Sequence, residues 1–130
     1  MNRPLLALSF DRLHRVLLVR YAMVFSLENL AQLDDAISAF VAREGLTTVI
    51  VDFSDVPAGA IDPALMRARG GKPSLVPGQP RVFISPNDSV FGMLRIYGAY
   101  QETTPVVVRT LDAALSALQI DPKEFKPVLA

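Results

Sequence analysis

The feature that most constrains the fold is the stretch Thr47–Asp55, which has the sequence TTVIVDFSD. Its centre, Val49–Val51, is a short apolar run of β-branched residues, preceded by helical periodicity and followed by polar residues. A central strand of a parallel sheet, buried on both faces, has this pattern. We therefore expect an α/β fold in which the other elements are wound around this strand.

The segments on either side of this strand alternate between strand-like and helix-like patterns. Leu5–Phe10 and Val16–Val24 predict two strands joined by a polar turn, which is a hairpin. A helix is predicted from the cap Ser26 to Gly45, before the central strand, and a second helix begins after it at Asp62 and Pro63 with Ile61 packed on Met66. Next come a strand at Arg81–Ser85, a helix from Val90 to about Glu102 and a strand at Pro105–Arg109. The chain then continues with a helix capped by Thr110 and a capped final turn at Asp121–Glu124.

This order, β-β-α-β-α-β-α-β-α, predicts one domain over residues 1–130 with a five-stranded mixed sheet. Right-handed crossovers make strands two to five parallel and leave the first strand antiparallel at an edge. Crossovers that all step the same way place the helices mainly on one face. Strands two and five are apolar on both sides, so part of the other face needs cover from a second subunit, a tail or a ligand. Since 51% of the residues are hydrophobic and the formal net charge is zero, we expect a homodimer.

The composition argues against several classes of partner and chemistry. Thirteen basic residues balance thirteen acidic ones, so neither nucleic acid nor a membrane surface is expected as a partner. The chain has no cysteine, which leaves no disulfide and no thiolate site and favours a cytoplasmic location. No stretch approaches the roughly 20 apolar residues that a membrane span needs. The apolar run near the N-terminus is too short for a signal peptide, and no cofactor is expected.

The element order, together with Val51–Met66, resembles the STAS-like (SpoIIAA-like) domains. These are related in fold to anti-sigma-factor antagonists and to the lipid-carrying Sec14/CRAL-TRIO domains. Asp52-Phe53-Ser54-Asp55 takes the place of the antagonists' Asp-Leu-Ser-Gly, and Asp62-Pro63-Ala64-Leu65 that of their Asp-Ser-Ser-Gly-Leu. The serine that is phosphorylated in the antagonists falls at Pro63 or Ala64, neither of which has a hydroxyl. The resemblance therefore implies the fold without the phosphorylation switch.

The C-terminal half is more similar to the bacterial STAS/Sec14-type branch of this fold. Its members resemble Val82–Ser89 followed by Phe91–Tyr97, then a strand and a Leu-Asp-Ala-Ala-Leu helix. This resemblance, which covers about Leu5 to Leu118, implies a SpoIIAA-like fold and no particular activity.

Polar residues gather where the predicted parallel strands end, which is where open α/β sheets bind ligands. The residues placed there are Asp52, Ser54, Asp55, Ser85, Asn87, Asp88, Arg109 and Thr110. They predict either a small polar pocket or a set of helix caps and turn formers, and we favour the second. Asp52 ends an apolar strand and must be hydrogen-bonded, for which a helix N-terminus is the expected partner. Asp62 is both a helix cap and a ligand candidate.

A second group of candidates flanks the loop Lys72–Pro80, which is rich in glycine and proline. One interpretation is an anion site formed by the basic residues Arg67, Arg69, Lys72 and Arg81. The favoured interpretation is a solvated loop, and a third is a lid over a pocket. The motif is not a Walker A loop, because Pro73 follows Gly71-Lys72 where a serine or threonine belongs.

A third group lies on the helix that starts near Val90. Tyr97 and Tyr100 share a side with Phe91 and Leu94, which favours core packing and leaves a partner surface or an apolar ligand pocket as the alternative. Arg95 on the same helix is interpreted as forming a surface ion pair.

No residue pattern predicts catalysis or a metal site. His14 is the only histidine and lies in the hairpin turn, without the nucleophile or second ligand that a triad or a zinc site needs. Glu28, Asp34 and Asp35 are interpreted as the solvated face of the first helix. An enzyme is therefore the least favoured function.

Two functions remain. The favoured one is a non-enzymatic regulatory or protein-interaction module. The alternative is a carrier or sensor that holds a small apolar or amphipathic ligand between the helices and the Gly/Pro loop, as the Sec14 resemblance implies. A cavity of several hundred Å³ lined by Leu, Phe and Met would favour the carrier, and a solid core with a flat apolar surface paired across a two-fold axis would favour the interaction module.

Overall fold

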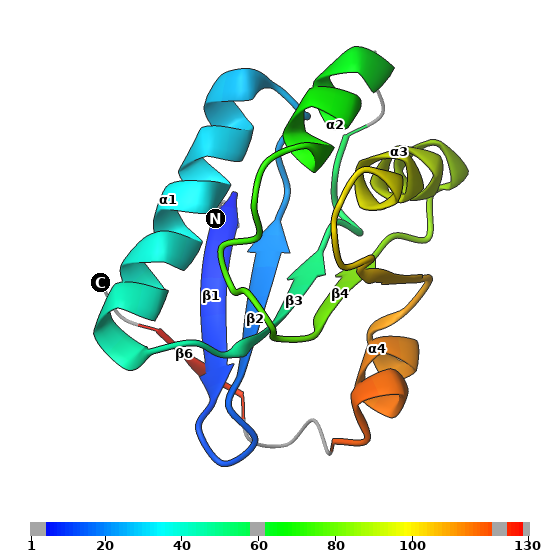
Figure 1. The fold of residues 1–130 in the computed structure, drawn as a ribbon. Coiled ribbons are helices and arrows are strands. Elements are labelled where there is room, and N and C mark those ends of the chain that lie inside the picture. Colours follow the sequence, from blue (N-terminus) through cyan, green and yellow to red (C-terminus); the bar gives the residue numbers. More distant parts are fainter. Residues whose placement is uncertain (1–4, 58–61, 121–124, 129–130) are drawn as a thin grey trace.

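The computed structural model describes residues 5–57, 62–120 and 125–128, and its strands and helices alternate along the chain (Figure 1). The elements are β1 (Leu6–Asp11), β2 (Val16–Tyr21), α1 (Leu27–Glu44), β3 (Thr48–Asp52), α2 (Pro63–Gly70), β4 (Arg81–Ile84), α3 (Asp88–Ala99), β5 (Val106–Val108), α4 (Leu111–Leu118) and β6 (Lys126–Pro127). This confirms the α/β class. None of the helices in these three ranges is long and apolar enough to cross a membrane.

The strands form one mixed sheet in the order β5-β4-β3-β2-β1-β6. β1 pairs antiparallel with β2, and β2, β3, β4 and β5 run parallel, as predicted. The prediction of five strands with the first at an edge is wrong, because β6 pairs with the outer side of β1 through Phe10 and Lys126. A two-residue strand that contains Pro127 carries no alternating pattern, so periodicity does not reveal it. The capped turn predicted at Asp121–Glu124 lies outside the described residues.

The sequence signals for α1 are confirmed by its contacts. The Ser26 hydroxyl accepts a hydrogen bond from the amide of Asn29 at 3.0 Å, which satisfies one of the free donors of the first turn. Gly45 ends the helix at φ +88°, and its amide bonds the Val41 carbonyl at 2.8 Å. Between these ends, four residues at helical spacing are buried against the sheet: Leu30, Leu33, Ile37 and Phe40.

α2 is short and meets α3 at a glycine. Asp62 caps α2 and Pro63 opens it, as predicted. A Cβ atom added at Gly70 would lie 2.5 Å from the carbonyl oxygen of Tyr97 and 2.7 Å from the Cβ of Tyr100, so the two helices approach where a side chain is missing. The proposed packing of Ile61 on Met66 lies outside the described residues.

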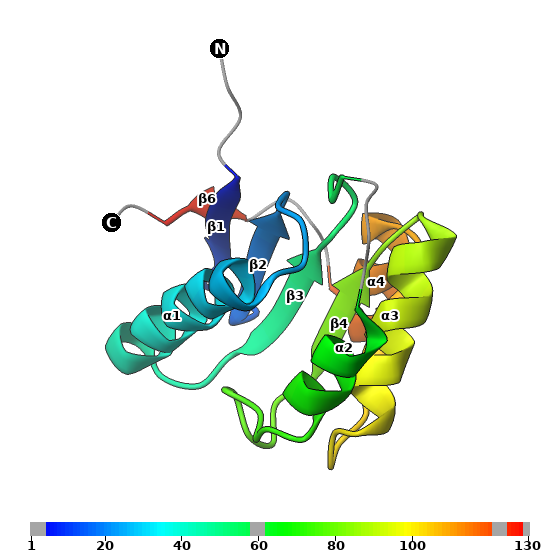
Figure 2. The same ribbon diagram turned by 90° about the horizontal axis from the view of Figure 1, so that it is seen from above.

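The sheet separates two cores. α1, α2 and α3 cover one face, and α4 lies on the other (Figure 2), in agreement with helices mainly on one side. On the second face, α4, Ile120 and Phe125 pack on β-strand residues such as Ile50 and Val82. Ala114 and Leu115 of α4 are buried there. Part of the cover that we expected from a second subunit, a tail or a ligand is thus supplied by α4 and the residues that follow it.

Candidate functional site

A cavity of about 120 Å³ lies on the side of the sheet that α1, α2 and α3 cover. An engineered apolar cavity of about 150 Å³ accepts benzene, so this space is suited to a single ring or a short chain. Most of the lining is apolar and comes from six parts of the fold. These are the β3 segment with Val49, Val51 and Phe53, β4 with Phe83, α1 with Leu30, Leu33 and Ile37, α2 with Met66, α3 with Leu94 and Tyr97, and the loop between α2 and β4 with Leu75 and Val76.

The strand alternation explains the floor of the cavity. Val49 and Val51 point to this face, while Ile50 between them belongs to the core on the other face. Phe53 follows β3 and contacts Phe83 with ring centroids 5.8 Å apart in an edge-to-face arrangement. Aromatic rings and β-branched side chains therefore form the floor of the cavity.

An aromatic cluster extends this wall toward β2. Phe53 also lies 5.4 Å from both Tyr21 and Phe25, measured between ring centroids. The Tyr21 hydroxyl donates to the carbonyl oxygen of Val24 at 2.8 Å. Burial raises the pKa of Tyr21 to about 12, although the positive charge of Arg69 acts in the opposite direction and lowers this pKa. Tyr21 is therefore an uncharged part of the core at neutral pH.

The loop between α2 and β4 forms the outer wall of the cavity. Val76 at its middle is only 2% exposed and belongs to the same core cluster as Leu33 and Met66. The hydroxyl oxygen of Ser74 accepts from the Val76 amide at 3.1 Å and shapes the turn. The interpretation of this loop as solvated is therefore wrong at Val76, which anchors the loop in the core.

An ion pair between α1 and α2 lies at the rim. Arg69 bonds both carboxylate oxygens of Asp34, and the Nη1–Oδ2 distance is 2.7 Å. Burial lowers the pKa of Arg69 and the Asp34 carboxylate raises it, with a net rise. Asp34 is thus not part of a solvated face. Its spacing of four from Leu30 and three from Ile37 is the sequence signal that places it beside the apolar stripe of the helix.

Arg81 holds together the ends of α2, α3 and the loop. Its guanidinium is buried and donates to the side-chain oxygen of Gln101 at 2.7 Å and to the hydroxyl of Tyr97 at 3.1 Å. The Gln101 amide in turn donates to the carbonyl oxygens of Gly70 at 2.6 Å and Lys72 at 2.7 Å. The sequence gives no periodic signal for this network, because its members lie on four separate segments.

The predicted anion site therefore reduces to one free cation. Arg69 and Arg81 both line the cavity but are engaged inside the chain. Lys72 also lines it, is exposed, and its amine makes no ion pair within residues 5–57, 62–120 and 125–128. Arg67 is exposed and is not part of the lining.

The three candidate residues on α3 differ in their exposure and in whether they line the cavity. Tyr97 lines the cavity and is partly buried, as predicted for core packing with the hydroxyl at the rim. Tyr100 is 55% exposed at the end of the helix and does not line the cavity. Arg95 is exposed, and the ion pair predicted for it is not formed with any residue of the described ranges.

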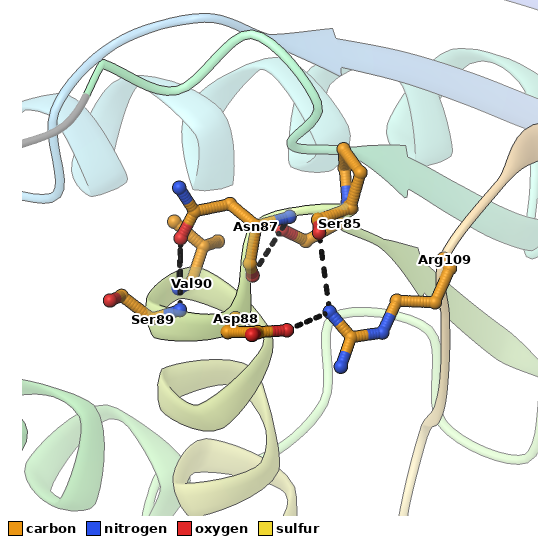
Figure 3. Close-up of polar contacts among 7 residues, drawn as sticks. Ser85, Asn87, Asp88, Ser89, Val90 and Arg109 are labelled. Atoms are coloured by element: carbon orange, nitrogen blue, oxygen red, sulfur yellow. Dashed lines mark hydrogen bonds and ion pairs between the residues drawn. The ribbon is translucent and has the colours of Figure 1, made fainter.

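The polar residues at the ends of β4 and β5 bond one another (Figure 3). The Asn87 side chain accepts from the amides of Ser89 and Val90 and caps α3. Arg109 donates to Asp88 at 2.7 Å, and its guanidinium lies 3.9 Å from the centroid of the Phe91 ring. These contacts support the interpretation as caps and turn formers.

The carboxylates near β3 are likewise used locally. Asp52 is nearly buried, and its Oδ1 accepts from the Ser54 amide at 2.9 Å, so its partner is its own turn and not the helix N-terminus that we expected. Ser54 and Asp55 are exposed. Asp62 accepts from the Ala64 amide at 2.9 Å as the cap of α2. None of these four residues lines the cavity.

A contact between a buried acid and an exposed histidine, outside the candidate sites, was not anticipated. Asp11 is fully buried at the end of β1, and its Oδ2 lies 2.7 Å from Nδ1 of His14. The Oδ1 atom accepts from the His14 amide at 3.1 Å. Burial raises the pKa of Asp11, but the bonds and charge of His14 bring it below its ordinary value. The pair closes the β1–β2 hairpin.

No protein-family profile matches the chain, and no curated protein matches it either. The STAS-like resemblance therefore stays a prediction. The described residues contain no group of three or more His, Cys, Asp or Glu side chains able to hold a metal ion. What the cavity offers on its own geometry is an apolar binding surface with a polar rim.

Proposed function

We propose that the chain is a non-enzymatic module that binds a small ligand, as a carrier or sensor, in the cavity between α1, α2 and residues 72–76. The observation that carries this proposal is the apolar lining by Leu, Phe and Met side chains, although the cavity of about 120 Å³ is smaller than the several hundred Å³ that we expected of a carrier. Apolar side chains outnumber the polar ones in this lining, which is the arrangement of small-molecule sites in general. The volume limits the enclosed part of the ligand to about one ring.

Two features support a cavity that is formed before the ligand arrives. The Arg69–Asp34 pair fixes α2 against α1, and the Arg81–Gln101 network fixes the start of the loop against α3. A site held in this way loses little conformational entropy when a ligand binds, so more of the contact energy contributes to affinity.

Toluene titration followed by methyl NMR tests the proposal directly. We expect shifts at the methyl groups of Leu33, Val49 and Val51, which line the cavity. The methyl groups of Val82 and Leu115 lie in the core on the opposite face and serve as internal controls. Equal shifts in both sets, or no shift in the first, would contradict the proposal.

A cavity-filling variant gives an independent test. Leu33→Trp places an indole into the cavity and is expected to abolish toluene binding. Leu27→Trp lies on the same helix at a side chain that is 66% exposed, and it is expected to bind toluene as the unchanged chain does. Thermal unfolding of both variants checks that each is folded.

The interaction-module function and the homodimer stay predictions, as do the absence of enzyme activity, a cytoplasmic location and the ligand or partner roles of Asp52, Ser54, Asp55, Asp62, Arg95 and Tyr100. Native mass spectrometry distinguishes the two functions. A bound small molecule would support the carrier, and a bare dimer would support the interaction module.

A further inference from the structure

The charges around the cavity are unbalanced. Its lining contains three cations, Arg69, Lys72 and Arg81, and one anion, Asp34, which gives a formal charge of +2. The whole chain has a formal net charge of zero. The excess of positive charge is therefore concentrated at this site and favours a negatively charged ligand.

Lys72 is the cation that remains available. Arg69 is bonded to Asp34 on both carboxylate oxygens, and the three donor contacts of Arg81 go to Gln101, Tyr97 and the carbonyl of Thr103. At Lys72, the backbone is engaged on both sides: its amide donates to the Arg69 carbonyl at 3.1 Å, and its carbonyl accepts from Gln101 at 2.7 Å. The backbone position of Lys72 is thus fixed, while its amine has no bonding partner among the residues that the structure describes.

Lys72 also lies where the apolar cavity meets a polar surface. A second, more open hollow of about 570 Å³ adjoins the loop on the side of the α3 C-terminus. Lys72, Pro73, Ser74 and Val76 line both spaces, together with Arg81. A molecule whose apolar end fills the cavity has its other end at this boundary.

Ser74 adds a hydrogen-bond donor at the same boundary. Its oxygen accepts from the Val76 amide, which leaves the hydroxyl hydrogen for another acceptor. An ammonium and a hydroxyl together match a single carboxylate. A phosphate generally draws on several donors and guanidinium groups, and here both arginines are occupied.

On the basis of the proposed function, we propose that the ligand is a monoanionic amphiphile, namely a carboxylate on a single ring or short chain, with its charge bound by Lys72. The apolar part enters the space between Leu33, Met66 and Val76, and the carboxylate stays at the rim beside Ser74.

Phenylacetate and its neutral analogue phenylacetamide are the matched probes for this inference. NMR titrations of the full chain give the affinity of each. We expect phenylacetate to bind about fivefold more tightly than phenylacetamide, the factor that corresponds to the upper end of an exposed ion pair. In Lys72→Met this preference is expected to fall to about one.

Lys126→Met is the control variant, since Lys126 is an exposed lysine on β6 that does not line the cavity. It is expected to keep the preference for phenylacetate. If toluene and phenylacetamide bind but phenylacetate has no advantage, or keeps it in Lys72→Met, this inference is wrong and the proposed function stands. If none of the three probes binds, both are wrong.

Discussion

Asp11 shows how one buried side chain depends on one neighbour. The carboxylate has no solvent exposure, and both of its oxygens are bonded by His14. Losing the imidazole would leave Oδ2 of the buried carboxylate unpaired and its desolvation uncompensated, while the backbone amide of residue 14 still bonds Oδ1. Asp11 and His14 are three residues apart in a turn, a spacing that turns commonly show, so the sequence indicates the turn but not the burial of the acid.

Replacing the histidine tests this dependence. We expect His14→Ala to lower the free energy of unfolding at neutral pH by about 1–3 kcal/mol, measured by urea denaturation. The pKa of Asp11 in the folded state is below its ordinary value, so its contribution to stability is present above that value and is lost as pH falls through the folded-state pKa. Acid unfolding of His14→Ala is therefore expected at a higher pH than in the unchanged chain.

Arg12→Ala is the control for that experiment, because Arg12 lies in the same turn and is exposed. Its stability and acid transition are expected to match those of the unchanged chain. Equal acid transitions for His14→Ala and Arg12→Ala would show that the ion pair contributes nothing to the folded state.

At the scale of the elements, the contact between α2 and α3 positions one wall of the cavity. Gly70 allows the close approach, and Met66 and Arg69 on the same short helix line the site. Two glycines in this region have opposite surroundings, since a Cβ at Gly92 in α3 would meet no atom within 4 Å. Gly70 is the last residue of α2 and Gly92 lies inside α3, and the sequence does not show that only the first has a close neighbour.

The two glycines therefore predict opposite effects of the same substitution. Gly70→Ala forces α2 away from α3 and is expected to cost about 1–3 kcal/mol of stability. Gly92→Ala is expected to stabilise by about 0.5–1 kcal/mol, because alanine favours the helix and the space is open. Thermal unfolding measures both. The same sign for both variants would contradict the packing described for Gly70.

The elements also show which parts of the fold were predictable. Caps at Ser26, Asp62 and Thr110, with apolar spacing behind them, indicate their helices because these signals are local. β6 was missed because its pairing with β1 is long-range and its two residues have no pattern of their own. Thr47–Asp55 was predicted as one strand, but the ladder ends at Asp52 and Phe53 turns into the core.

At the scale of the whole molecule, the cavity arises where distant segments meet. Its lining comes from α1, β3, α2, the loop, β4 and α3, so only the three-dimensional arrangement reveals it. Individual members were visible in the sequence: Tyr97 was a candidate, and Arg69, Lys72 and Arg81 were grouped around the loop. Their partners, Asp34 and Gln101, lie 35 and 20 residues away along the chain from the arginines they bond, and no sequence pattern links them.

The burial of Val76 has a consequence for how long a guest stays. Before a guest can leave past this segment, the isopropyl group must come out of the core, which costs about 1.5–3 kcal/mol. The open form is then a minor population, and dwell time is governed by how often it occurs. Val76→Thr keeps the shape but is easier to hydrate, so NMR line-shape analysis with toluene should show faster exchange. An unchanged exchange rate would mean that guests use another exit.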